Sequence, residues 1–330
     1  MAEPPVTGPG GDGALLPEQA PPGFRCGFVA LVGRPNVGKS TLLNALLGRK
    51  LSITSPKPQT TRHRIRGVDT GPGHQAIYVD TPGWHRPRGR GLGRALNRAM
   101  VRAAQAALGD VDLILLVVEA LRWTELDEGI LVLAREARGP EGRPVPLVAA
   151  VNKVDRVPDK RRLLPYLDEL SRRAPFEAIV PVSATRGTHL DRLKEEVRRL
   201  LPEGPPLFPP GQLTDRDPGF LAAELVREQL MRRLGEELPY RVAVEAESLR
   251  EEEGREGPLL RVRAVIWVER ESHKPIVIGK GGAVLKEVGQ RARLEMERLF
   301  GRRVHLGLWV RVREGWSDDE RLVRRLGIED

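Results

Sequence analysis

Short apolar segments alternate with longer helical stretches over the first two thirds of the 330-residue chain. The segments are rich in Val, Ile, Leu and Ala and are bounded by Gly, Pro or Asp, which is typical of buried strands. The predicted strands are Phe28–Val32, Ala76–Val79, Leu113–Val118, Val145–Val151 and Ala178–Val182. A repeated strand–helix order predicts an α/β domain with a mainly parallel sheet and helices on both faces, whose ligands bind at the carboxyl ends of the strands.

The pattern changes after Leu201, where six prolines between residues 202 and 218 predict a stiff, extended linker. Beyond it, the order helix, strand, strand, helix, helix, strand predicts a second, α+β domain. Its predicted elements are Phe220–Leu234, Tyr240–Glu247, Leu259–Glu269, Pro275–Ile278, Ala283–Phe300 and Val304–Val312. A last helix is predicted from a capping box, with Ser317 as N-cap and Glu320 three residues later.

The chain is therefore expected to have four parts. Residues 1–25 form an extension that its Pro- and Gly-rich composition predicts to be disordered. The first domain covers 26–201, the linker 202–219 and the second domain 220–330.

Composition narrows the functional class. A single cysteine, Cys26, allows no intrachain disulfide and fits a reducing cytoplasm. No apolar run approaches the roughly 20 residues that cross a bilayer. The net charge of +9 favours a polyanionic partner, nucleic acid before a membrane surface. From residue 220 onward, 22 Lys and Arg face 21 Asp and Glu, so the basic surplus lies in the first part of the chain.

The segment Gly33–Ser40 has the pattern G-x-x-x-x-G-K-S between the first strand and a helix that begins near Thr41. Its glycines let backbone N–H groups surround phosphate oxygens, while Lys39 is placed for the β- and γ-phosphates and Ser40 for Mg²⁺. The helix N-terminus favours the same anion. The predicted phosphate-binding residues are Gly33, Asn36, Val37, Gly38, Lys39, Ser40 and Thr41.

Three further motifs follow later strands. Asp80-Thr81-Pro82-Gly83 puts a carboxylate where it can hold Mg²⁺ and puts the Gly83 N–H within reach of a γ-phosphate. Asn152-Lys153-Val154-Asp155 favours guanine, because the Asp155 carboxylate can accept from N1–H and the 2-amino group, a donor pair that adenine lacks. In Ser183-Ala184-Thr185 a backbone N–H can meet guanine O6.

These four motifs, in this order, resemble the translation-factor class of P-loop GTPases over residues 28–200. The resemblance implies that Asn152 and Asp155 read the base, that Lys153 lies along its face and that Ala184 contacts O6. A threonine in the loop 52–64 should close over Mg²⁺ and the γ-phosphate, and the resemblance favours Thr61 over Thr60. The predicted Mg²⁺ ligands are therefore Ser40, Thr61 and Asp80.

The chemistry of hydrolysis leaves several candidates open. Trp84 stands where Ras-like proteins carry a water-orienting Gln, and His85 follows it. Asn36 is a candidate ligand for K⁺, which related GTPases with the same P-loop use as a transition-state charge. Arg62 and Arg64 either act in cis or are solvated or bound to a polyanion. The residues expected in the chemical step are Lys39, Thr61, Gly83 and Asn36.

A G-x-x-G sequence, Gly279–Gly282, separates the short and long helices of the second domain. Its glycines let a phosphodiester backbone approach, and Lys280 points at phosphate. The order of elements resembles a type II KH domain, whose loop clamps about four nucleotides of single-stranded RNA. The predicted RNA-binding residues are Ile278, Gly279, Lys280, Gly281, Gly282 and Lys286.

A GTPase domain followed by one KH domain resembles the Era family of ribosome-assembly GTPases. Further matching stretches are Gln59–Ile65, Tyr78–Gly83, Leu238–Tyr240 and Gly315–Arg321. The resemblance implies GTP or GDP with Mg²⁺, binding to 16S rRNA near its 3′ end, small-subunit maturation, a bacterial cytoplasmic location and peripheral contact with the inner membrane. A monomer is expected. Pro56 and Pro58 depart from the family and stiffen the loop before Thr61.

Two other functions are weaker. A tRNA-modification partner of the same superfamily would need a dimerisation or folate-binding domain and a terminal catalytic Cys. A GTP-dependent signalling or membrane-associated switch would not need a KH domain, and the C-terminus Gly327–Asp330 carries no lipidation motif.

Overall fold

The computed structural model describes residues 20–83, 94–106, 108–109, 111–254 and 257–328. Trp84, His85 and most of the N-terminal extension, with its predicted disorder, lie outside the described residues.

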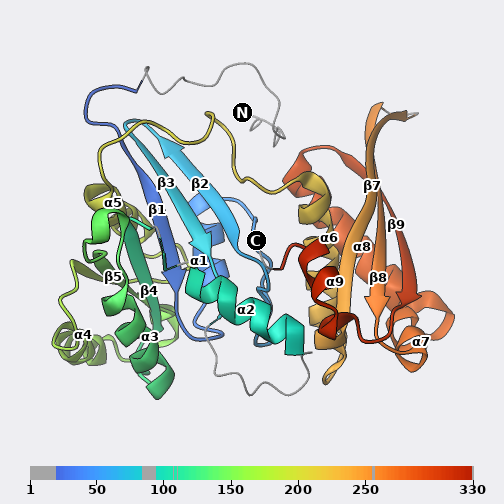
Figure 1. The fold of residues 1–330 in the computed structure, drawn as a ribbon, viewed down its shortest axis with the longest axis horizontal. Coiled ribbons are helices and arrows are strands. Elements are labelled where there is room, and N and C mark those ends of the chain that lie inside the picture. Colours follow the sequence, from blue (N-terminus) through green and yellow to red (C-terminus); the bar gives the residue numbers. More distant parts are fainter. Residues whose placement is uncertain (1–19, 84–93, 107, 110, 255–256, 329–330) are drawn as a thin grey trace.

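A six-stranded sheet forms the first domain, in the order β2-β3-β1-β4-β5-β6 (Figure 1). Its strands are β1 (Arg25–Val32), β2 (Ile65–Gly71), β3 (His74–Asp80), β4 (Leu113–Glu119), β5 (Leu147–Asn152) and β6 (Ala178–Pro181). All pairs are parallel except β2–β3. Strand β2 was not predicted, because Asp69 and Thr70 interrupt its apolar pattern at the sheet edge.

Helices cover both faces of this sheet (Figure 1). They are α1 (Lys39–Leu47), α3 (Glu125–Glu136), α4 (Leu163–Ser171) and α5 (Leu190–Leu200). Helix α2 (Arg94–Ala106) packs instead against the second domain, in a cluster with Trp316 and Leu322. A hydrophobic cluster lies on each face of the sheet, and alternate residues of β1 pack into the two clusters, since successive side chains of a strand point to opposite faces. Val29 and Leu31 join the cluster of α1 and α5, while Ala30 and Val32 join that of α3 and α4. The predicted α/β class is confirmed.

The second domain packs two long helices on one face of a three-stranded sheet, and its last short helix packs with Ala243 and Trp267, whose side chains point to the other face. Its elements are α6 (Pro218–Arg233), β7 (Val242–Gly254), β8 (Gly257–Val268), α7 (Lys274–Ile278), α8 (Ala283–Phe300), β9 (Arg303–Val312) and α9 (Glu320–Arg325). Strands β7 and β8 are antiparallel, and β8 and β9 are parallel. This is the predicted type II KH order. The β7–β8 hairpin is longer than predicted because its far half, rich in Glu and Arg, is solvent-exposed.

The predicted capping box at Ser317 is wrong. Ser317 is buried in a 3₁₀ turn, Trp316–Asp318, and its hydroxyl donates to the Glu269 carboxylate. The helix begins at Glu320 and is capped by Asp319, whose Oδ1 accepts from the Leu322 N–H at 3.1 Å. Burial of the Trp316 side chain holds the turn in place, so the next available carboxylate caps the helix.

The proline-rich linker is bound to the first domain along its length. The Cys26 N–H donates to Pro202 O at 3.0 Å, and the Val68 N–H donates to Leu213 O at 2.8 Å. Between them, the buried Gln75 side chain accepts from Leu207 and Phe208 N–H groups. These hydrogen bonds fix the path of the linker along the first domain, and with it the position at which α6 begins.

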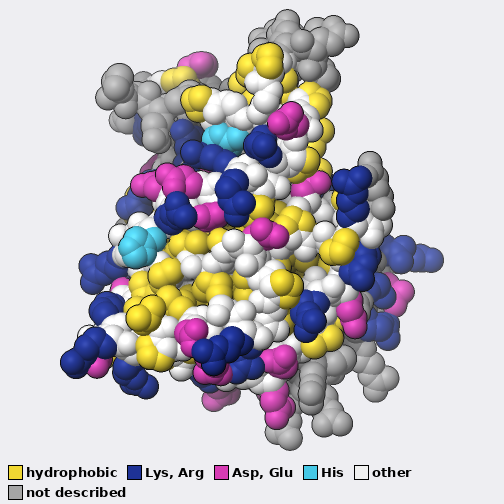
Figure 2. Space-filling view, turned by 90° about the vertical axis from the view of Figure 1, so that its left-hand side faces the viewer, with side chains coloured by type: hydrophobic (Ala, Val, Ile, Leu, Met, Phe, Trp, Pro, Cys, Tyr) yellow, Lys and Arg dark blue, Asp and Glu magenta, His cyan; other side chains and the backbone are white. Residues whose placement is uncertain are grey.

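Charge is not gathered on the side of the first domain that faces away from the second. Figure 2 shows Lys and Arg interspersed there with Asp and Glu, around a middle area of hydrophobic side chains. Among the described residues in this view, Lys and Arg therefore form no single continuous basic patch.

Candidate nucleotide and RNA sites

Two glycines of the P-loop are required by close packing. A Cβ atom on Gly33 would lie 2.4 Å from the carbonyl oxygen of Val117. Gly38 has φ of 102°, and a Cβ there would lie 2.5 Å from Asn152 Nδ2. With no room for side chains, the backbone N–H groups of the loop stay open to an anion at the start of α1.

Lys39 is buried at the head of α1. Its ammonium donates to the carbonyl oxygens of Gly33 at 2.9 Å and Arg34 at 3.3 Å. Burial lowers the pKa of Lys39 to about 8. A cation held at this cost in desolvation is well placed to neutralise phosphate oxygens.

Three oxygen donors meet at the predicted Mg²⁺ site. The hydroxyls of Ser40 and Thr61 lie 2.8 Å apart. Asp80 is fully buried, and among the described residues neither of its carboxylate oxygens has a hydrogen-bond partner. Burial raises the pKa of Asp80, and the nearby Ser40 and Lys39 offset only part of that rise. An uncompensated carboxylate beside two hydroxyls fits a hard divalent cation such as Mg²⁺.

The neighbouring threonine points elsewhere. The Thr60 hydroxyl donates to Lys57 O at 2.8 Å, so Thr61 is the one of the pair whose side chain lies at Ser40. Thr81 has a supporting contact instead, because its hydroxyl donates to Leu31 O at 2.9 Å and ties the end of β3 to β1.

A cavity above the P-loop brings the phosphate-site residues together. It is lined by Asn36, Gly38, Lys39, Ser40 and Thr41, by residues of the loop 53–61, and by Gly83. A second cavity adjoins it and is lined by Asn36, Gly38, Thr41, Asn152, Lys153, Ala184, Thr185 and Arg232, among others. The first cavity holds the predicted phosphate-site residues and the second most of the predicted base-site residues.

Asn152 braces the base site. Its Nδ2 donates to Val37 O at 2.9 Å and its Oδ1 accepts from the Ala184 N–H at 3.1 Å. Both ends of the amide are therefore used between the two loops. Asp155 accepts from the Ser183 hydroxyl at 2.5 Å and is otherwise exposed, which leaves its second oxygen open to a base.

An ion-pair network behind the P-loop was missed by the sequence analysis. Arg34 donates to Asp127 at 3.1 Å and to Glu119 at 2.6 Å, and Lys153 reaches Glu119 at 3.1 Å. Burial opposes ionisation of Glu119, but Arg34 and Lys153 more than offset it and hold the pKa of Glu119 below its usual value. The sequence did carry one indication of this network, because Glu119 directly follows a predicted strand, at the edge of the sheet where ligands bind.

Arg62 does not have either of its predicted roles. Its side chain is 1% exposed and donates to Val242 O at 2.8 Å and to Pro239 O at 3.1 Å in the second domain. Burial first, and then the charge of Arg227, lower the pKa of Arg62 to about 9. A guanidinium enclosed in this way is neither solvated nor available to a polyanion.

The G-x-x-G loop has the backbone expected of a phosphate clamp. Gly279, Gly281 and Gly282 all have positive φ, and a Cβ on Gly279 would lie 2.5 Å from Val284 Cγ2. Nothing lies within 4 Å of a Cβ built on Gly281 or Gly282, so that side of the loop is open. Lys280 and Lys286 are exposed on either side.

A groove that the sequence analysis missed opens beside this loop. It lies between α8 and β9, and its lining residues are Gly282, Leu285, Lys286, Gly289, Gln290, Arg293, Leu306 and Leu308. Apolar side chains flanked by amide and cationic groups suit unstacked bases and their phosphates. The groove depends on a helix and a strand meeting in space, which no local motif reports.

A guanine-selective site over a P-loop, joined to an αββααβ module with a G-x-x-G loop, defines a P-loop GTPase with a KH domain. Family models agree: residues 28–153 match the 50S ribosome-binding GTPase family and residues 237–317 match the KH domain. The chain is 53% identical over 314 residues to GTPase Era of Stenotrophomonas maltophilia, covering 95% of this chain and all of that protein. It is 51% identical over 313 residues to GTPase Era of Pseudomonas aeruginosa, covering 95% and 98%. The chain belongs to the GTPase Era family.

Two solved structures have the same fold across nearly the whole chain. One is a variant of Aquifex aeolicus Era bound to GDP·AlF4⁻, with TM-score 0.83 and 42% identity over 92% of this chain and 99% of that one. The other is Era in complex with MgGDPNP and nucleotides 1506–1542 of 16S ribosomal RNA, with TM-score 0.83, 41% identity and the same coverage.

The described residues contain no helix with the length and apolar character that a bilayer crossing requires.

Substitution of Gly38 tests the packing of the P-loop. The Gly38→Ala change should weaken GDP binding by at least about 100-fold, or about 2.7 kcal/mol, because the new Cβ displaces Asn152. Gly48→Ala is the matched control: it also has positive φ, but its Cβ meets open space. It should cost about 1 kcal/mol of stability and leave the GDP affinity unchanged. Calorimetric titration with GDP measures the affinity of both variants. An unchanged affinity in Gly38→Ala would contradict the claim that the close approach of Gly38 to Asn152 is needed for nucleotide binding.

Proposed function

We propose that this protein binds GTP with Mg²⁺, hydrolyses it to GDP and phosphate, and binds the 3′-end region of 16S rRNA through its KH domain during assembly of the small ribosomal subunit. The observation that carries the proposal is the presence, in one chain, of a complete nucleotide site and an open G-x-x-G loop beside a groove. It is supported by a structure of the same fold that contains both a GTP analogue and 16S rRNA.

In this proposal each site residue has a defined role. Lys39 and the P-loop N–H groups neutralise the β- and γ-phosphates, and the Gly83 N–H meets the γ-phosphate. Ser40, Thr61 and Asp80 hold Mg²⁺, directly or through water, and the cation supplies charge that stabilises the leaving phosphate. Asp155 selects guanine, Lys153 covers the base, and Ser183, Ala184 and Thr185 close the site around it.

Four residues form the RNA loop proper, and two flank it. Gly279, Gly281 and Gly282 let the phosphodiester backbone approach, and Lys280 contributes charge. Ile278 and Lys286 extend the contact along α7 and α8. The groove of α8 and β9 then takes the bases.

The domain limits remain part of the proposal, with the GTPase domain at 26–201 and the KH domain at 220–330. A monomer in the cytoplasm fits a factor whose partner is ribosomal RNA. No observation favours the alternative of a signalling or membrane-associated switch, and the KH domain would be unexplained in it.

Potassium is proposed as the extra positive charge of the chemical step. Asn36 has φ of 64°, is exposed, and lines both nucleotide cavities, where its amide oxygen can meet a cation beside the phosphates. Turnover should be several-fold faster in KCl than in NaCl of equal ionic strength. The difference should vanish in Asn36→Gly, a change that the positive φ tolerates. Equal wild-type rates in both salts would remove potassium from the mechanism.

Substitution of Gly281 tests the RNA half of the proposal. Gly281→Asp should lower affinity for a 16S 3′-end RNA at least ten-fold, because it adds negative charge where a phosphate passes and the open space accommodates the side chain. Affinity for GDP should not change. Filter binding or fluorescence anisotropy measures the RNA affinity.

Gly315→Asp is the control, since Gly315 also has positive φ and open space around it but lies outside the loop. RNA affinities that are equal in the wild type and in Gly281→Asp would refute the KH assignment.

A further inference from the structure

The loop that carries Thr61 is held by the C-terminal domain on both sides of that residue. Leu51 before the loop and Ile65 after it belong to the hydrophobic cluster of α6, α8 and the second sheet. Within the loop, Arg62 reaches into the second domain as described above, and the His63 ring nitrogens face Gly327 O and Glu224. Between these contacts, the Thr61 hydroxyl points to the P-loop and lies 2.8 Å from that of Ser40.

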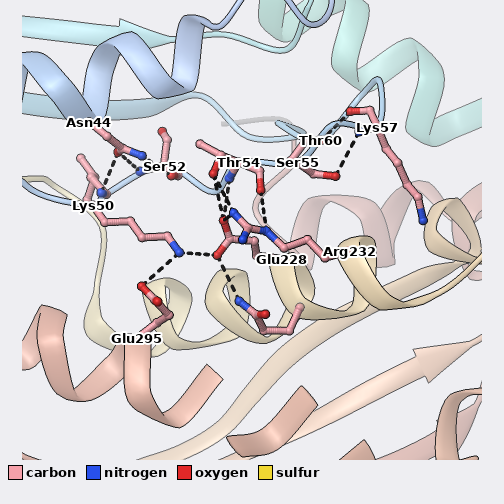
Figure 3. A network of polar contacts seen from close by, with 12 residues as sticks. Asn44, Lys50, Ser52, Thr54, Ser55, Lys57, Thr60, Glu228, Arg232 and Glu295 are labelled. Atoms are coloured by element: carbon pink, nitrogen blue, oxygen red, sulfur yellow. Dashed lines mark hydrogen bonds and ion pairs between the residues drawn. The ribbon is translucent and has the colours of Figure 1, made fainter. Parts of the chain in front are cut away.

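One end of the loop is bound by Glu228, which is completely buried (Figure 3). Its Oε1 accepts from the Thr54 N–H at 2.9 Å and from the Thr54 hydroxyl at 3.1 Å. Arg232, one turn further along α6, donates to Thr54 O at 3.1 Å. Lys50 completes the cluster with an ion pair to Glu228 at 2.5 Å. Every polar group of Thr54 is thus satisfied by α6.

The other end is bound by Arg227. One nitrogen of its guanidinium donates to Thr60 O at 2.7 Å and to Glu224 Oε2 at 2.7 Å, while Nε donates to Glu224 Oε1 at 2.6 Å. Burial opposes ionisation of Glu224, but Arg227 and His63 more than offset it and hold the pKa of Glu224 well below its usual value. The peptide that precedes Thr61 is therefore fixed by a charged pair that is itself enclosed.

These residues share one face of α6, because positions 224, 227, 228 and 232 are three, four and eight residues apart. Each acid has two partners: an arginine of its own helix, and a side chain of the GTPase domain, His63 for Glu224 and Lys50 for Glu228. Buried ion pairs of this kind add little net stability, but they fix geometry, since breaking one leaves a charge without compensation.

We infer that Arg227 and Glu228 are positioning residues for GTP hydrolysis, holding Thr60 and Thr54 on the C-terminal domain so that Thr61 is preset beside Ser40. The inference rests on the proposed function, in which Thr61 meets Mg²⁺ and the γ-phosphate. GDP has no γ-phosphate, so the effect of these residues is specific to GTP. Arg232 extends the same face to the wall of the nucleoside cavity.

The test uses the full chain and Arg227→Lys, which keeps a cation beside Glu224 but lacks the forked guanidinium that spans Glu224 and Thr60. Affinity for a non-hydrolysable GTP analogue with Mg²⁺ should fall about ten-fold, as should turnover at saturating GTP, with GDP affinity unchanged. Arg233→Lys is the matched control. Arg233 is the last residue of α6, and its half-exposed guanidinium pairs with Glu287 inside the C-terminal domain rather than with the GTPase domain. It should change none of these values.

Two further variants keep the outcome decisive. Glu228→Gln retains the shape at Thr54 without the charge and should give the same GTP-specific loss, which carries the test if Arg227→Lys does not fold. Thr61→Ala should remove the preference for GTP, and adding Arg227→Lys to it should weaken GTP-analogue binding no further.

Equal losses for GDP and the GTP analogue, no loss for either, or additive effects with Thr61→Ala would overturn the inference. If Thr61→Ala itself leaves the GTP preference intact, the proposed Mg²⁺ role of Thr61 fails instead.

Discussion

Helix α6 is enclosed by protein over most of its length, and this enclosure constrains both domains. Eleven of its sixteen residues are buried, and they include Glu224, Arg227 and Glu228 as well as the apolar side that packs in the KH core. Charged groups without access to water need partners of fixed geometry. The GTPase domain provides these partners from the loop between α1 and β2, so the position of this loop is set by the other domain.

The same helix packs against the helix that directly follows the RNA loop. Helix α8 starts directly after Gly282 and packs its buried residues, Val288, Ala292 and Met296, in the cluster that contains α6. On the same helix, Glu287 pairs with Arg233 of α6, and Glu295 pairs with Lys50 of the GTPase domain. An unbroken path of packed and ion-paired groups therefore joins Thr61 to the G-x-x-G loop. Contiguity alone is not coupling, which requires that the two ligands favour the same arrangement of this path.

The sequence predicted what local chemistry determines. The P-loop, Asp80 and the guanine-reading segments are contiguous motifs whose spacing reflects the chemistry of phosphates and bases, and the five strands that precede or link them are continuous apolar runs. The order of elements in the second domain was read from periodicity in the same way, and its resemblance to a type II KH domain came from that order together with the G-x-x-G sequence. Strand β2 was missed because its second half, with the partly buried Asp69 and the exposed Thr70, breaks the apolar pattern at the sheet edge.

The predictions that were wrong or missing concern residues whose surroundings depend on contacts between segments distant in the sequence. Arg62 looks like a surface residue until the carbonyl groups of Pro239 and Val242 are brought to it. Ser317 has the spacing of a cap, but the burial of Trp316 turns its hydroxyl toward Glu269. The RNA groove and the charged face of α6 likewise exist only after folding, since their members are scattered over the chain.

The affinity of the full chain for a 16S 3′-end RNA, measured with Mg²⁺ and a non-hydrolysable GTP analogue and again with GDP, addresses the link through α6 most directly. If Thr61 and the RNA loop are joined as the contacts indicate, the two affinities should differ by at least about five-fold, and by reciprocity the RNA should change the preference for GTP over GDP by the same factor. Identical RNA affinities with the two nucleotides would contradict a link between the nucleotide site and the RNA loop through α6.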